Sequence, residues 1–260
     1  MCELLALNFN QPVSPDISFR AFRRRGDGNP DGWGLAFYAD ESAQVFKEPI
    51  CVDRSELSDF LRNYPFVQSQ IVIGHVRLAT AGNVCRRNTH PFTREHAGRE
   101  YVFAHNGTLK GEYRSELPIG RFNPIGDTDS EHVFCSVLDQ VCTRGAAGWT
   151  ADDFEWLHGA FQRVNRFGHF NCLFSDGRYL FAYHDKEGYN GLNYLRREAP
   201  FGTIHLVDED FTVQITEEHT TEKGYVLATR KLTDENWVSF QPGQLVVFKD
   251  GEIVWSRGGI

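Results

Sequence analysis

Cys2 is the residue whose position most clearly suits it to a role in catalysis. Because an initiator methionine is removed when the next residue is small, we expect Met1 to be cleaved and Cys2 to become the N-terminal residue. A thiol and a free α-amine would then share one residue, and such an amine titrates near about 7.7–8.0, close to the optimum for a general base at neutral pH. A lone cysteine beside Leu4 and Leu5 is more often a small apolar residue of a buried strand. The nucleophile assignment therefore depends on residues further along the chain.

Three later segments carry polar groups that suit one type of substrate. Arg77 ends an apolar run; its planar guanidinium suits a bidentate grip on a carboxylate, although alone it is typical of a strand-end side chain that reaches water. Asn106-Gly107 is typical of a tight turn, but an amide beside a glycine N–H also supplies the two donors of an oxyanion hole. Asp129 falls in the first turn of an expected helix, where it either complements the helix dipole or binds an ammonium. Together with the Cys2 thiol, these groups amount to a receptor for an α-amino acid whose side-chain carbonyl is attacked.

The elements that must position these residues follow from hydrophobic periodicity. Thr128 and Glu131 have the spacing of a helix capping box, and Thr150 is followed by Asp153 at the same spacing. Strands, two adjacent helices and further strands imply an α+β fold of two antiparallel sheets with helices on their outer faces. We expect strands at 3–8, 34–38, 44–47, 70–78, 101–104, 170–174, 179–183, 192–196, 211–215, 225–229, 244–248 and 253–255, and helices at 55–64, from 128 and from 150.

Composition narrows the function classes. The chain has 260 residues, 41% of them hydrophobic, and shows no repeat or long linker, which favours one domain. Its net charge of −8 provides no basic field for nucleic acid, and its short arginine clusters are typical of solvated surface or of the rim of an anion site. No run approaches the roughly 18 apolar residues of a membrane span. The six cysteines are scattered and no metal-ligand spacing is present, so we expect no metal and a reducing, cytoplasmic location.

Taken jointly, the motifs resemble the class II glutamine amidotransferases, which belong to the N-terminal-nucleophile hydrolases. The resemblance lies in Cys2 and in the segments GHVRLAT (74–80), NTHPF (88–92), AHNGTL (104–109) and GDTDSE (126–131). The segments DGWG (31–34) and SDGRY (175–179) look like the small stand-alone bacterial branch. The family implies a four-layer αββα sandwich and one glutaminase-type domain over 2–260, with Met1 removed.

The resemblance also implies a role for each matched residue. Cys2 would attack the γ-carboxamide of glutamine, and its own α-amine would relay the proton. Asn106 and Gly107 would stabilise the oxyanion. The substrate-binding residues would be Arg77 for the α-carboxylate, Asp129 for the α-ammonium, and Thr80. No cofactor is implied. Where many relatives carry Trp and His, this chain has Leu78 and Ala81, so any contact made by those side chains is not expected here.

Three functions remain open from the sequence. The first is a free-standing glutaminase that passes ammonia to a separate synthetase subunit. The second is a hydrolase of another γ-glutamyl amide in thiol or glutathione-like metabolism. The third is a non-catalytic protein that retains the amino-acid receptor, against which the intact set of candidate residues argues. The first two functions require the same binding of the γ-glutamyl group, so the leaving group stays unassigned.

Overall fold

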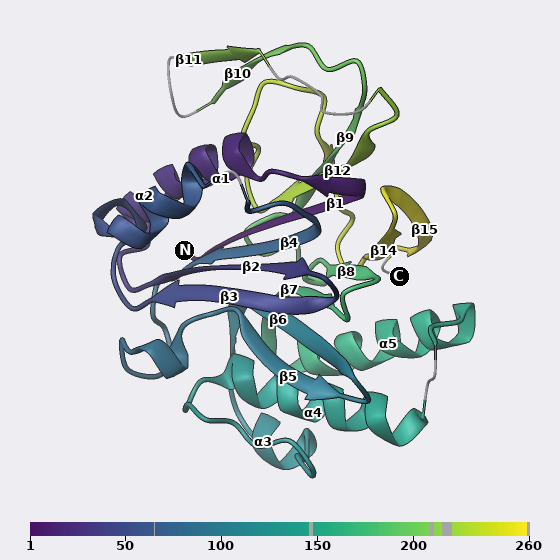
Figure 1. The fold of residues 1–260 in the computed structure, drawn as a ribbon. Coiled ribbons are helices and arrows are strands. Elements are labelled where there is room, and N and C mark those ends of the chain that lie inside the picture. The colour runs from purple at the N-terminus through teal and green to yellow at the C-terminus, as the bar shows by residue number, and fades with distance from the viewer. Residues whose placement is uncertain (65, 146–147, 208–210, 215–219, 259–260) are drawn as a thin grey trace.

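The chain forms two facing antiparallel sheets between two layers of helices (Figure 1). The computed structural model describes residues 1–260 except 65, 146–147, 208–210, 215–219 and 259–260. Three apolar clusters separate the layers: one between the sheets and one between each sheet and its helices. The predicted α+β, four-layer αββα sandwich is confirmed.

The first sheet has seven strands in the order β13-β9-β12-β1-β4-β2-β3. Its central strand β1 is buried on both faces: Leu5 and Leu7 pack towards the helices, whereas Leu4 and Ala6 pack towards the second sheet. This alternation follows from the two-residue period of a strand. The bounds are β1 (Glu3–Val13), β2 (Trp33–Ala39), β3 (Ser42–Glu48), β4 (Ser69–Val76), β9 (Asn193–Glu198), β12 (Lys223–Ala228) and β13 (Val238–Ser239).

The second sheet has six strands in the order β15-β14-β8-β7-β6-β5. Its longest strand, β6, pairs with β7 from Val102 to Leu109. A separate hairpin of β10 and β11 stands away from both sheets (Figure 1). The bounds are β5 (Phe92–His96), β6 (Arg99–Leu109), β7 (Gly168–Ser175), β8 (Leu180–Tyr183), β10 (Thr203–Leu206), β11 (Phe211–Gln214), β14 (Leu245–Lys249) and β15 (Glu252–Arg257).

The helices cover the outer faces of the sheets (Figure 1). On the first sheet lie α1 (Asp16–Arg23) and α2 (Glu56–Arg62); on the second lie α4 (Asp129–Arg144) and α5 (Ala151–Val164), with the short α3 (Tyr113–Glu116) nearby. Thr150 and Asp153 form a complete capping box. At Thr128 only half of the motif forms, because the Glu131 carboxylate binds Arg94 and the Gly126 N–H instead.

The structure differs from the sequence predictions in two respects. Asn106-Gly107 does not form a turn, because β6 continues through both residues to Leu109 and pairs with β7 along its whole end. The helices α1 and α3 and the strands β5, β10 and β13 were not predicted. In α1, Phe19 and Phe22 bury one face. The first correction matters for function, since it places the Asn106 amide on a rigid strand rather than on a loop.

Candidate active site

Cys2 lies immediately before β1, at the end of the first sheet where β4 finishes. Its Sγ is 3.2 Å from both the amide nitrogen and the carbonyl oxygen of Leu78. Burial raises the pKa of the Cys2 thiol, and this outweighs the lowering by the Leu78 N–H, the N-terminal charge and Arg77. Met1 precedes it and is 57% exposed, so the Cys2 nitrogen here belongs to a peptide bond.

Asn106 reaches across from the second sheet to the nucleophile. Its Nδ2 donates to the Cys2 carbonyl oxygen at 2.6 Å. The next residue, Gly107, has φ 156°, and a Cβ there would lie 1.9 Å from the His169 carbonyl oxygen. Only glycine fits this position, because any side chain would collide with the neighbouring strand.

Arg77 follows β4 and its side chain is only 3% exposed. Its guanidinium donates to the carbonyl oxygens of Ala81 at 2.9 Å and of Gly82 and Asn83 at 3.3 Å each. Within the described ranges of the chain, Arg77 has no carboxylate partner. The loop that follows β4 thus wraps around this buried cation.

Asp129 and Thr80 both contact the same end of β6. One carboxylate oxygen of Asp129 accepts from the Leu109 N–H at 2.7 Å, and the other accepts from the Ser130 N–H at 2.9 Å. The Thr80 hydroxyl lies 2.8 Å from that of Thr108. A carboxylate has about four lone-pair sites, so Asp129 keeps capacity for a further donor.

The structure therefore brings Cys2, Asn106, Gly107, Thr80 and Asp129 to β6, whereas the Arg77 guanidinium binds the loop 81–83. Cys2 touches Asn106 and the residue that follows Arg77. Thr80 and Asp129 reach this end of β6 through Thr108 and Leu109.

Three buried histidines, His75, His90 and His105, lie close together beside the site. Burial first, and then the neighbouring His105, lowers the pKa of His75 to about 3. Burial also lowers the pKa of His90 and of His105. His105 Nε2 faces the His169 carbonyl oxygen at 3.2 Å and must donate to it, so Nδ1 accepts from the Ser130 hydroxyl at 2.8 Å. The rings of His75 and His105 tie β6 to β4, α4 and β7. Among the described residues, Cys2 Sγ hydrogen-bonds only with Leu78.

One contact to the nucleophile was missed by sequence reasoning. Asn190 Nδ2 donates to the Cys2 carbonyl oxygen at 2.8 Å. The available signal was the second Asn-Gly pair, Asn190-Gly191, which follows a tyrosine just as Asn106 follows a histidine. Nothing in its spacing connects it to position 2.

Three cavities of the described part of the chain lie away from Cys2. A cavity of about 620 Å³ lies at the far end of β1, between Asn8 and Lys249, and smaller ones lie near α1. Among the described residues, no three His, Cys, Asp or Glu side chains are arranged so that they could hold a metal ion. No helix within the described ranges is long and apolar enough to cross a membrane.

Comparison with known proteins defines the class. A family model described as class II glutamine amidotransferases matches residues 1–258. The chain therefore belongs to the class II glutamine amidotransferases, as its motifs predict. YafJ of Escherichia coli K12, itself only provisionally assigned as a glutamine amidotransferase, is 38% identical over 261 residues, which cover 98% of this chain and 100% of that protein. An uncharacterised protein of Methanocaldococcus jannaschii is 43% identical over 258 residues, covering 99% of this chain and 72% of its own length.

Solved structures agree with the fold. The crystal structure of a predicted glutamine amidotransferase from Pseudomonas aeruginosa has a TM-score of 0.73 and 31% identity, covering 98% of this chain and 100% of that one. The glutamine phosphoribosylpyrophosphate amidotransferase of Bacillus subtilis has a TM-score of 0.66 at 16% identity, covering 99% of this chain and 49% of that one. The latter likeness is one of fold alone.

Proposed function

We propose that the protein hydrolyses the γ-carboxamide of glutamine, or another γ-glutamyl amide, through a γ-glutamyl thioester on Cys2. Family membership supports chemistry on the glutamine amide nitrogen in general. The observation that carries the finer proposal is the contact between the Asn106 amide and the Cys2 carbonyl oxygen at 2.6 Å, with Gly107 next along the strand. It joins the candidate nucleophile and the candidate oxyanion donors at one place.

The reaction proposed begins once removal of Met1 has freed the Cys2 α-amine. The amine takes the Sγ proton, and the thiolate attacks the γ-carbonyl carbon to form a tetrahedral oxyanion. Asn106 Nδ2 carries two N–H bonds and gives one to Cys2, so the other is available to the oxyanion together with the Gly107 N–H. Collapse of the intermediate breaks the C–N bond, and the protonated amine delivers its proton to departing ammonia. The same amine then deprotonates water, which hydrolyses the thioester to glutamate and restores the thiol.

The substrate's amino-acid end is assigned to Arg77, Asp129 and Thr80. The buried guanidinium of Arg77 has no acidic partner among the described residues, so it suits the α-carboxylate. The remaining lone pairs of Asp129 suit the α-ammonium. The exposed Thr80 hydroxyl would add a polar contact at the mouth of the site.

We propose that the ammonia is either released into water or passed to a synthetase outside residues 1–260. The αββα fold occupies these residues, and the family match extends over 1–258. A larger amine as leaving group is the alternative within the same mechanism. All six cysteines are free thiols, which fits the proposed cytoplasmic location.

The test is amide hydrolysis by Cys2→Ala, with Cys142→Ala as the matched control. Cys142 is also a half-buried free thiol, but it lies on α4. Ammonia and glutamate release from glutamine, and amine release from a panel of γ-glutamyl amides, should vanish in Cys2→Ala and persist in Cys142→Ala. Undiminished release in a folded Cys2→Ala protein would refute the proposal. The panel member with the highest kcat/KM identifies the leaving group.

A further inference from the structure

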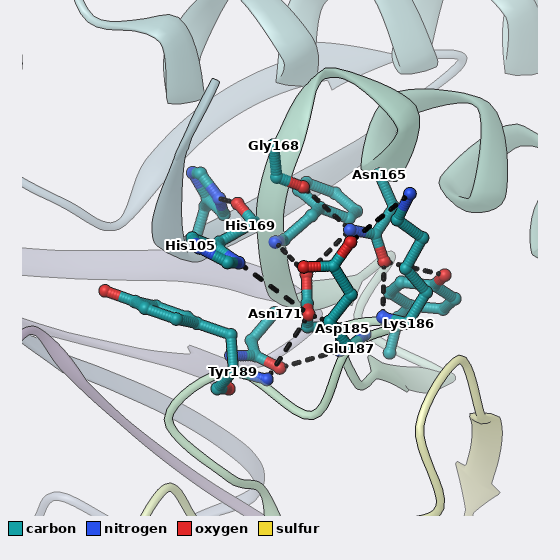
Figure 2. A network of polar contacts seen from close by, with 11 residues as sticks. His105, Asn165, Gly168, His169, Asn171, Asp185, Lys186, Glu187 and Tyr189 are labelled. Atoms are coloured by element: carbon teal, nitrogen blue, oxygen red, sulfur yellow. Dashed lines mark hydrogen bonds and ion pairs between the residues drawn. The ribbon is translucent and has the colours of Figure 1, made fainter. Parts of the chain in front are cut away.

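The loop between β8 and β9 is built around a buried carboxylate. Asp185 is fully buried, and four groups donate to it: Asn165 Nδ2 at 2.6 Å and the N–H groups of Phe170 and Glu187 at 2.8 Å and of Tyr189 at 3.3 Å (Figure 2). Burial acts to raise the pKa of Asp185, but these hydrogen bonds outweigh it and lower the pKa. A charged group so fully satisfied holds the loop backbone in one conformation.

Two buried asparagines complete the frame. Asn171 Nδ2 donates to the Tyr189 carbonyl at 2.7 Å, while its Oδ1 accepts from the Asp185 N–H at 2.8 Å. Asn165 Oδ1 accepts from the Lys186 N–H at 2.7 Å (Figure 2). Residues 185–189 are thereby fixed to the start of β7, the strand that pairs with Asn106 and Gly107.

The end of this loop lies at the nucleophile. The Tyr189 ring stacks on that of His169, with centroids 4.0 Å apart and planes 10° apart. The carbonyl of His169 accepts from His105, on the strand that carries Asn106. Asn190, which follows Tyr189, has φ 57° and places its side-chain amide 2.8 Å from the Cys2 carbonyl oxygen.

We propose that Asn190 is a positioning residue for Cys2, held in place by the Asp185-centred frame of residues 185–190. This inference rests on the proposed function, since it concerns how the thiol is aimed at its substrate. A carbonyl oxygen has two lone pairs, and in Cys2 one is taken by Asn106 and the other by Asn190. The two amides arrive from different segments, so together they fix the plane of the Cys2–Glu3 peptide. That plane sets the direction of the Cα–Cβ bond and hence the position of Sγ against Leu78.

The Asn190 amide also stabilises the hydrogen bond that Asn106 makes with Cys2. With Asn190 absent, the Cys2 carbonyl is held by Asn106 alone, and any movement of that carbonyl carries the thiol and the oxyanion donor with it. A misplacement of about 1 Å can cost about 10²-fold in rate. Removal of the Asn190 amide should therefore lower kcat with little change in KM, because no contact to substrate is lost.

Two substitutions test the side-chain amide of Asn190 separately from the backbone conformation at this position. Asn190→Gly keeps the positive φ without strain, and Asn190→Asp keeps the shape but turns an acceptor towards the Cys2 carbonyl. The matched control is Asn10→Asp, because Asn10 Nδ2 donates to the Thr221 carbonyl at 2.9 Å at the far end of the same strand. The readouts are kcat and KM, the labelling rate of Cys2 by the glutamine analogue diazo-oxo-norleucine, its alkylation rate by iodoacetamide from peptide mass spectrometry, and Tm.

If Asn190 positions Cys2, its substitution should change two reaction rates of the Cys2 sulfur in opposite directions. In both Asn190 variants, kcat and labelling by diazo-oxo-norleucine should fall about tenfold to 10²-fold, while alkylation by iodoacetamide rises because Sγ is released from Leu78. KM should stay within about threefold, and the control should match wild type. Wild-type kcat and alkylation rates in folded Asn190→Gly would overturn the inference. If wild type itself reacts with no γ-glutamyl compound, the proposed function fails, whereas the alkylation comparison still decides the role of Asn190.

Discussion

Gly107→Ala tests whether the Gly107 N–H belongs to the oxyanion hole. An alanine Cβ would lie 1.9 Å from the His169 carbonyl oxygen, whereas ordinary contact begins at 3.4 Å, so β6 and β7 must separate locally by about 1.5 Å, the difference of the two. Loss of one oxyanion donor costs about 10²–10³ in kcat, equivalent to about 2.7–4 kcal/mol of transition-state stabilisation. We therefore expect kcat to fall at least about 10²-fold.

The assay separates this local displacement from loss of fold. Overpacking costs about 1–3 kcal/mol of unfolding free energy, and each kcal/mol lowers Tm by about 2–4 °C in a chain of this size. Gly111→Ala is the matched control, because Gly111 has φ 72° but an added Cβ meets nothing within 4 Å. It should lose a little stability and keep its kcat. A folded Gly107→Ala protein with more than half of wild-type kcat would refute the assignment.

Three further substitutions test neighbouring parts of the account. Arg77→Lys should raise KM for glutamine at least about tenfold, because an ammonium cannot reproduce the bidentate fork; an unchanged KM removes Arg77 from the site. Asn106→Ala should lower kcat by about 10²–10³, and a loss below tenfold contradicts its role. Asp185→Asn should lower Tm at neutral pH, since an amide donor would face the four donors that now bind the carboxylate. The folded-state pKa of Asp185 is depressed, so its contribution is complete above the unfolded pKa of about 3.9 and is lost as pH falls through the folded value. The gap in Tm between wild type and Asp185→Asn should accordingly narrow as the pH falls below the unfolded pKa, and a gap that does not narrow contradicts this.

The fold was largely predictable because short sequence patterns mark most of its strands, helix starts and turns. The apolar run that begins β1, the capping residues of α4 and α5 and the Asp250-Gly251 turn before β15 all lie within short stretches of sequence. The arginine cluster 23–25, at the end of α1 and just after it, was expected to be solvated surface. Arg23 is instead buried and paired with Asp59 at 2.7 Å, and Arg25 is buried with a bond to the Lys231 carbonyl.

The candidate site was predictable only where the motifs are local. Arg77, Asn106 and Asp129 each sit in a recognisable segment, whereas Asn190 acquires its contact through a loop whose conformation depends on Asp185, Asn165 and Asn171. A contact between residues 188 positions apart is a product of tertiary structure. No periodicity or spacing encodes it.

The most direct test of the central claim is mass spectrometry of the intact protein before and after incubation with diazo-oxo-norleucine. The account predicts a starting mass that lacks the initiator methionine, a gain of one adduct, and a peptide map that places the adduct on Cys2. A protein that retains Met1 and still turns over glutamine, or one whose adduct lies on another cysteine, would contradict it.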